Sequence, residues 1–498
     1  MEIIQQALMY GSEAFSLQNL LYCFAGVFLG TLVGVLPGLG PATSMSILLP
    51  GVLMIPNPVT AIIFLAGIYY GTQYGGSITA ILLKLPGEAS SVVIVNDGYA
   101  LSQMGKSGTA LSISAIGSFV AGTFSTIAIA LFAVPASQLA FYFGPVEYAS
   151  LMGLGLLSII VLGGDSFLKS FSMVMLGLLL STIGYDVNSG TERMTFGIPA
   201  LGEGLPFVIL AMSIFGIAEV FYNFIRQEKE IIIEKCYSLK FKDMYPTKEE
   251  MGIAIMPILR GTVIGSVLGV IPGAGPILAS VVSYALEKRI SKHPEKFGKG
   301  AIEGVASPES ANNASAQTSF IPLLSFGIPT GPTMAIILSV LLLFGLQPGP
   351  QLISFNPGLF WTLIVSMWIG NFFLIILNLP LISLWVSITR IPQSVLSIII
   401  LLTCLIAAYV VTQSWLIMGL LLPLSIAAVV LKLLDCDPSP LLLSFVIGKM
   451  FEEYLRRSLI ISRGDWFIFL DKPISMTFIL IAVMMIVWSY IVKKKKII

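Results

Sequence analysis

Long apolar segments separated by short breaks run along the whole chain of 498 residues. A helix needs about 20 apolar residues to cross a bilayer, and several of these segments reach that length. The shorter ones predict half-helices, hairpins or halves of broken helices. The first set of predicted segments covers 17–36, 42–55, 59–85, 108–134, 146–163, 166–185 and 205–225. The second set covers 251–271, 276–286, 310–328, 333–346, 357–379, 380–389, 394–411, 414–433 and 474–492. The pattern predicts an all-α polytopic membrane protein.

One sixteen-residue block occurs twice. GVFLGTLVGVLPGLGP, Gly26 to Pro41, returns as GTVIGSVLGVIPGAGP, Gly261 to Pro276, an offset of 235 residues from 26 to 261. In each copy G-x-x-x-G-x-x-x-G places three glycines on one helix face, so a second backbone can pack closely. The helix then meets P-G-x-G-P, which cannot continue it. We expect two pseudo-symmetric repeats with broken helices or hairpins at the membrane midplane.

The repeat extends loosely beyond this block. ITAILLKLPGEASS and IPLLSFGIPTGPTM are both apolar runs that end at a proline, Pro86 and Pro329, an offset of 243 residues from 86 to 329. An inverted arrangement is favoured over a parallel one, because it brings the two broken helices together. The predicted organisation is a first transmembrane repeat, 1–225, a polar linker, 226–250, and a second repeat with extra C-terminal helices and a basic tail, 251–498.

Composition narrows the function classes. The chain is 56% hydrophobic and 11% charged, and its net charge of +1 gives no footprint for nucleic acid. Four scattered cysteines and one histidine predict neither a metal site nor a disulfide framework. GKS at Gly105 to Ser107 is not a phosphate loop, because Ala100 stands where that motif needs glycine. No catalytic residues are found, so we expect that the protein is not an enzyme.

Charge also suggests an orientation. No Lys or Arg precedes Lys84, which is wrong for a cleaved signal peptide, so the first apolar segment is expected to stay as a helix. The chain ends in Lys493 to Lys496, and the positive-inside rule places this end in the cytoplasm. The same rule predicts that the basic loops at 288–299 and 449–472 lie on that side as well.

The two P-G-x-G-P turns are the first candidate for a binding site. Backbone N–H groups at a helix N-terminus bind anions without a cationic side chain. Gly38, Gly40, Gly273 and Gly275 shape these turns. The hydroxyls that follow the first turn, Thr43 and Ser44, could add donors to a substrate carboxylate. The alternative is that each break is only a kink that permits close packing.

A second candidate is the polar run SPESANNASAQTSFIP, Ser307 to Pro322. Asn312, Asn313 and Ser315 could donate to a carboxylate. Glu309 and Ser310 could hold a coupling proton or sodium ion. The absence of Lys and Arg favours a site in the membrane. The alternative is an exposed loop that caps a helix.

The stretch from Tyr69 to Leu111 is the third candidate. Lys84, among leucines, could meet a substrate carboxylate, or could equally extend to the membrane interface. The dipeptide Asp97-Gly98 predicts a turn.

Several of these blocks together resemble the large membrane subunit of the tripartite tricarboxylate transporters, the TctA family. The resembling blocks are GVLPGLGP, YYGTQYGGSITAILLKLPGE, NDGYALSQMGKSGTALSISAIGSF, GVIPGAGP, YALEKRISKHPEKFGKGAIEGVASPESANNAS, PLLSFGIPTGPTMA and LQPGP. They run in register from about Gly26 to Pro350. Two departures stand out: Thr330 follows Pro329 where the family commonly has glycine, and SPES stands where APEA is common.

The resemblance implies a permease of the bacterial inner membrane. Such a permease takes up tricarboxylate or dicarboxylate anions with a small membrane subunit (TctB-like) and a periplasmic solute-binding protein (TctC-like). An ion gradient would supply the energy, with no cofactor other than Na⁺ or H⁺. We therefore expect a carboxylate:cation symporter embedded in the lipid bilayer. The alternative is a passive channel or scaffold subunit for small organic anions.

Overall fold

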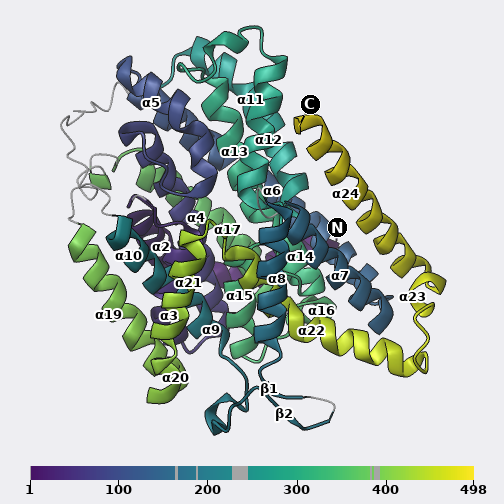
Figure 1. The fold of residues 1–498 in the computed structure, drawn as a ribbon. Coiled ribbons are helices and arrows are strands. Elements are labelled where there is room, and N and C mark those ends of the chain that lie inside the picture. Colours follow the sequence, from purple (N-terminus) through teal and green to yellow (C-terminus); the bar gives the residue numbers. More distant parts are fainter. Residues whose placement is uncertain are drawn as a thin grey trace.

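A computed structural model of the protein describes residues 2–36, 38–162, 166–186, 189–226, 245–381, 384–385 and 393–497. Within these residues the fold is almost entirely helical, and its β structure is a small antiparallel hairpin of β1 and β2 (Figure 1). Eight of the described helical segments are long and apolar enough to cross a membrane. The predicted class, an all-α polytopic membrane protein, is confirmed.

The elements of the first half follow the predicted segments closely. In order they are α1 (Glu2–Gly11), α2 (Leu17–Gly34), α3 (Pro41–Leu53), α4 (Pro58–Leu83), η2 (Ala89–Ile94), α5 (Val95–Gln103), α6 (Ser107–Ala140), α7 (Pro145–Leu162), α8 (Phe167–Ser181), β1 (Gly184–Tyr185), β2 (Glu192–Arg193), α9 (Phe207–Ala211), η4 (Met212–Ile217) and α10 (Ala218–Arg226). Short 3-10 turns, η1 (Ser12–Phe15) and η3 (Pro199–Leu201), join some of them.

The second half begins at the capping box of Thr247 and Glu250, which starts α11. Its elements are α11 (Lys248–Gly269), α12 (Gly275–Ile290), η6 (Pro294–Lys296), α13 (Glu303–Thr318), α14 (Phe320–Phe326), α15 (Pro332–Leu343), α16 (Pro350–Phe355), α17 (Pro357–Asn378), α19 (Gln393–Thr412), α20 (Trp415–Gly419), α21 (Leu421–Leu433), α22 (Ser439–Ile461), α23 (Ile468–Asp471) and α24 (Pro473–Ile497). The predicted segments did not include α1, α5, α22 or the polar stretch 303–309 at the start of α13. The predicted segment 380–389 and the linker 226–250 fall largely outside the described residues.

The first glycine stripe packs α2 directly against the backbone of α4. A Cβ added at Gly30 would lie 2.3 Å from the carbonyl oxygen of Ile68, and one at Gly34 would lie 2.3 Å from that of Thr72. The contact is reciprocal, because a Cβ at Gly71 would lie 2.3 Å from the carbonyl oxygen of Val27. The predicted close approach of two backbones is therefore present.

The second stripe makes the same kind of contact between α11 and α13. Cβ atoms at Gly261 and Gly265 would each lie 2.2 Å from a carbonyl oxygen, of Ser307 and Ala311 respectively. The carbonyls that oppose the first stripe belong to Phe64, Ile68 and Thr72, and those that oppose the second to Ser307, Ala311 and Ser315. Each pair is 243 residues apart, as 307 is from 64, which is the offset between Pro86 and Pro329. An α2–α4 unit thus has a counterpart in α11–α13, and the inverted relation of the two halves stays a prediction.

The helix breaks also correspond. Gly38 and Gly273 both have φ of 80°, a left-handed conformation that favours glycine. α4 ends at Lys84 with φ of 60°, and α14 ends at Gly327 with φ of 73°, again 243 residues apart, from 84 to 327. Each is followed two residues later by a proline, which prevents the helix from resuming at once.

The predicted turn at Asp97-Gly98 is wrong, because both residues lie inside α5. The Asp97 side chain has a tertiary role there. Its Oδ1 accepts hydrogen bonds from the backbone N–H groups of Gly298, Gly300 and Ala301 at 2.8–2.9 Å, and its Oδ2 accepts one from the Tyr284 hydroxyl at 2.8 Å. A local pattern cannot reveal these partners, which lie about two hundred residues away.

Asp97→Ala should therefore lower the thermal unfolding midpoint of the purified protein by several degrees. Hydrogen bonds to a buried charge contribute about 1.5–3 kcal/mol each, and four donors would lose their acceptor. Glu203→Ala, which removes an exposed carboxylate, is the matched control. An equal midpoint for both variants would show that Asp97 does not hold the loop after α12.

The side of the membrane on which the basic segment 449–472 lies stays a prediction, and α24 separates this segment from the C-terminal lysines. α24 has 25 residues, which at 1.5 Å per residue gives a length of about 37 Å. Figure 1 shows it running along the side of the molecule from α23 to the C-terminus. Lys472 and the C-terminal lysines therefore lie at opposite ends of α24. Positive charge at 449–472 is also offset, since Arg456 pairs with Asp186 and Arg457 with Glu453.

Candidate functional site: a cavity between the broken helices

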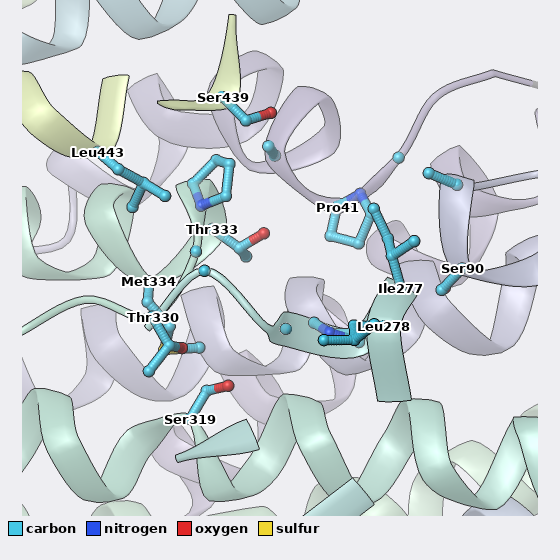
Figure 2. Close-up of a pocket in the computed structure, with 18 of the residues that line it drawn as sticks. Pro41, Ser90, Ile277, Leu278, Ser319, Thr330, Thr333, Met334, Ser439 and Leu443 are labelled. Atoms are coloured by element: carbon cyan, nitrogen blue, oxygen red, sulfur yellow. The ribbon is translucent and has the colours of Figure 1, made fainter. Parts of the chain in front are cut away.

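A cavity of about 520 Å³ lies where the helices break. Its lining comes from both halves of the chain, namely the starts of α3, α12, α15 and α22, a face of α4, and the segment 88–90 that precedes α5. Figure 2 shows Pro41, Ile277, Thr333 and Ser439 around it, with Ser319 beneath. The two glycine turns that the sequence singles out therefore open into one space.

Four α-helices have their N-termini at the cavity wall. α3 contributes Pro41 to Thr43, α12 Gly275 to Leu278, α15 Pro332 to Met334, and α22 Ser439 and Pro440. The first N–H groups of a helix lack intrahelical partners, and the helix dipole places partial positive charge there. Proline at the first or second position of all four helices removes one donor but fixes the entry angle. This arrangement suits an anion.

The charged side chains in the lining are acidic. No Lys, Arg or His of the described residues lines the cavity, whereas Glu88 and Asp437 do. Asp437 precedes the start of α22, and its Oδ1 accepts from the N–H of Ser439 at 2.9 Å and from its hydroxyl at 2.7 Å. Among the lining groups, the helix N-termini are therefore the source of partial positive charge.

Gln73, in the middle of α4, is fully buried and lines the cavity. Neither Nε2 nor Oε1 of its amide has a hydrogen-bond partner of good geometry, although the Tyr69 phenol lies near it one turn earlier. A buried amide without partners is costly and needs a physical explanation. A ligand that offers both an acceptor and a positive group or donor would satisfy both atoms.

Glu88 links the cavity to α13. Its Oε1 accepts from the Nδ2 of Asn312 at 2.8 Å and from the Ser90 hydroxyl, and its carboxylate caps η2. The other amide atom of Asn312, Oδ1, is buried without a partner, as is the hydroxyl of Ser315. Gln73 on α4, and Asn312 and Ser315 on α13, thus each have unused hydrogen-bonding capacity.

Comparison with known proteins now decides the family. The family model described as "Tripartite tricarboxylate transporter TctA family" matches residues 20–443. The chain belongs to the TctA family. It is a membrane subunit of a tripartite tricarboxylate transporter, and the family is one of transporters.

Two curated proteins of Agrobacterium vitis are similar to this TctA-family chain. One, "Uncharacterized 52.8 kDa protein in TAR-I ttuC' 3'region", is 48% identical over 476 residues, which cover 95% of this chain and 94% of that protein. The other, "Uncharacterized protein in TAR-II ttuC' 3'region", is 52% identical over 211 residues, which cover 42% of this chain and 87% of that protein. No solved structure matches the chain.

Some of the predicted substrate-binding residues line the cavity of this chain, and others do not. Gly40, Thr43, Gly273 and Gly275 line it. Gly38 lies in the exposed turn before it, and Ser44 is buried behind it, donating to the carbonyl oxygen of Gly40 at 3.0 Å. Asn312 reaches the cavity through Glu88, and Ser315 lies one turn further along α13.

Glu309, Ser310 and Asn313 lie away from the cavity, in a buried polar column. Glu309 Oε2 accepts from the Ser77 hydroxyl at 2.6 Å and from that of Ser114 at 3.0 Å. Asn313 donates to the Ser118 hydroxyl at 2.7 Å, and Ser310 donates to the carbonyl oxygen of Ala306 at 2.8 Å. The whole stretch from Gly304 to Thr318 is helical and buried, so the alternative of an exposed capping loop is wrong.

Lys84 does not line the cavity. It is exposed, ends α4 in a left-handed conformation, and its Nζ lies 5.7 Å from the centre of the Tyr99 ring. Lys84→Met should therefore leave carboxylate uptake close to the wild-type rate in a whole-cell assay. If Lys84→Met lost uptake although its amount in the membrane was normal, Lys84 would be part of the binding site.

Sequence reasoning missed Gln73, Glu88 and the α15 and α22 helix starts. The signal for α15 was present, since IPTGPTM, which begins one residue before Pro329, corresponds loosely to LPGEASS, which begins one residue before Pro86. Gln73 stands in a run of small and aromatic residues with no motif around it. Glu88 follows the first proline of LPGEASS, and no motif there marks it as part of a site.

Proposed function

We propose that this chain is the permease that carries carboxylate anions across the bacterial inner membrane by cation symport. A periplasmic binding protein would deliver the substrate, and a small membrane subunit would complete the complex, with the C-terminus cytoplasmic. The family supports the transporter part of this proposal. The observation that carries the carboxylate part is the meeting of four helix N-termini at a cavity without a basic side chain.

A substrate anion that binds in the cavity exchanges water for hydrogen-bond donors of the protein. A carboxylate entering the cavity gives up hydration and gains backbone N–H donors, the Gln73 amide and the dipoles of α3, α12, α15 and α22. Backbone donors hold an anion without a full opposite charge, so release is not blocked by an ion pair. Placement at breaks from both halves lets one half move against the other around the substrate.

Energy coupling is the second part of the proposal. An Na⁺ or H⁺ gradient would drive uptake, and no other cofactor is required. Glu309, with Ser310 beside it, was predicted to hold the coupling ion. Its buried carboxylate is bonded by hydroxyls, which fits a group that exchanges a proton. We keep this role as a proposal that Glu309→Gln tests.

The test is uptake of labelled citrate, malate and succinate into proteoliposomes. The chain is reconstituted with its small subunit and binding protein, and sodium and proton gradients are imposed separately. Accumulation above equilibrium under one gradient is the expected result. Equilibration without accumulation would support the passive channel instead, and no flux of any of the acids would overturn the carboxylate assignment.

A further inference from the structure

The segment that joins α12 to α13 presents a cluster of positive charge. Between residues 288 and 303 five side chains are cationic and two are acidic. All five cations are exposed, and none lies within salt-bridge distance of a carboxylate among the residues that the structure describes: Lys288, Arg289, Lys292, Lys296 and Lys299. The two acids have other partners, since Glu295 contacts the His293 ring at 3.3 Å and Glu303 accepts from the Ser291 hydroxyl at 3.3 Å. Much of this positive charge is therefore available to a ligand.

The backbone of this basic segment, residues 288–299, is held in place by the rest of the protein. Asp97 accepts hydrogen bonds from three N–H groups in the stretch 298–301, just beyond the last of the cations. Phe297 is buried, and its ring centre lies 5.3 Å from that of Tyr284 on α12. A segment whose shape is already fixed loses little conformational entropy when its side chains bind a ligand.

The helix that leads into the basic segment has an exposed apolar face. On α12, Val282 is 39% exposed and Leu286 is 37% exposed, and Arg289 follows three residues later on the same helix face. α11, which packs on α12, exposes a further apolar set: Met256, Leu259, Val263 and Val267. In a membrane protein such faces contact acyl chains. An apolar face that ends in cations matches the two parts of an anionic phospholipid.

The length of α12 places these cations at the membrane surface. α12 starts with Gly275 at the cavity and has 16 residues, which gives a length of about 24 Å. The cavity is predicted to lie near the midplane, and half of a hydrocarbon core is about 15 Å thick, so the last turn of α12 reaches the headgroups. Figure 1 shows the loop between α12 and α13 at the end of the molecule where α24 also finishes, which the positive-inside rule predicts to be cytoplasmic.

We propose that the end of α12 and the basic segment bind the headgroup of an anionic phospholipid, whose acyl chains lie along the exposed face of α12. Arg289 and the lysines donate to the phosphodiester oxygens, and arginine suits this geometry because its guanidinium can donate two parallel hydrogen bonds. The lipid site is separate from the cavity, and it does not depend on the carboxylate function.

The test is native mass spectrometry of the purified chain in a neutral detergent. The chain is titrated with phosphatidylglycerol or with phosphatidylcholine that has the same acyl chains. We expect saturable phosphatidylglycerol adducts and at least tenfold weaker binding of phosphatidylcholine. Equal affinity for the two lipids would overturn the proposal. Excess glycerol 3-phosphate should leave the adducts in place, and displacement by it would show a phosphate site that needs no lipid, which would also overturn the proposal.

Charge-neutralising variants locate the lipid site. Each basic residue near an anionic lipid contributes about fivefold in affinity, so Lys288→Gln with Lys292→Gln should weaken phosphatidylglycerol binding by about tenfold or more. Arg463→Gln with Lys472→Gln is the matched control, because it removes two exposed cations from the segment before α24. The control should bind as the wild type does, and thermal unfolding midpoints show that both variants are folded. Equal loss in the two double variants would show an effect of total charge and would overturn the proposal.

The same measurement on the complex separates a lipid from a protein occupant. We expect the phosphatidylglycerol adducts to persist when the chain is bound to its small membrane subunit. Their disappearance in the complex would show that this face of α12 is a subunit interface, and the lipid assignment would be wrong.

Discussion

Gln73→Leu is expected to lower carboxylate uptake at least about tenfold while the protein stays at least as stable as the wild type. Leucine has nearly the same size and keeps the packing of α4, but it can neither donate to a carboxylate nor accept from a ligand. A hydrogen bond to a charged group contributes about 1.5–3 kcal/mol, and each 1.4 kcal/mol is a factor of ten, so we expect uptake to fall by about tenfold to more than a hundredfold.

The thermal stability of Gln73→Leu distinguishes a binding role of this amide from a structural one. Both amide atoms of Gln73 lack partners of good geometry in the absence of ligand. Replacing a buried unpartnered amide with an apolar group should be neutral or stabilising. The measurements are the initial uptake rate and the thermal unfolding midpoint without substrate. Normal uptake would remove Gln73 from the binding site, and a lower midpoint would show that the amide has a structural partner.

Gly265→Leu is expected to prevent α11 from packing on α13, so that little folded protein reaches the membrane. A Cβ there would lie 2.2 Å from the carbonyl oxygen of Ala311 and 2.7 Å from its Cα, and backbone cannot move aside as a side chain can. Overpacking of this kind costs about 1–3 kcal/mol even where side chains can yield.

The matched control lies on the same helix. Gly252, near the start of α11, is exposed, and a Cβ there meets nothing within 4 Å. Gly252→Leu should therefore reach the membrane in wild-type amounts, as measured by immunoblot of membrane fractions and size-exclusion profile in detergent. Equal amounts of the two variants would show that the close contact of α11 and α13 is not required for folding.

The glycine stripes show what local sequence can predict. Glycines at four-residue spacing must share a helix face whatever surrounds the helix, so close approach of another backbone could be predicted for α2 and α11. The identity of the partner could not. On α4 the residues that face the first stripe include Gly67, Gly71 and Gly75, whereas on α13 those that face the second are serine and alanine. These pairings depend on tertiary packing, which a local pattern does not contain.

For the candidate site too, the local turns could be predicted from the sequence and the grouping of residues around the cavity could not. Glycine turns at 38–40 and 273–275 follow from proline and glycine chemistry, and they were predicted. The grouping of residues around the cavity depends on how the two breaks meet. Glu309 and Asn312 are neighbours one turn apart on α13, but they contact different partners, since Glu309 accepts from Ser77 and Asn312 donates to Glu88. For Lys84 the sequence left substrate contact and the membrane interface equally open, and the structure places it outside the cavity lining.

The most direct measurement of the central claim, that the cavity binds the carboxylate substrate, is protection of a cysteine placed in its wall. Thr333→Cys at the start of α15, in a background without the four native cysteines, would be treated with a membrane-impermeant anionic thiol reagent in the presence of citrate, malate or succinate. We predict that the acids transported in the uptake assay slow modification at 333 and leave modification of Ser189→Cys, between β1 and β2, unchanged. Equal modification rates at 333 with and without a transported acid would contradict the account.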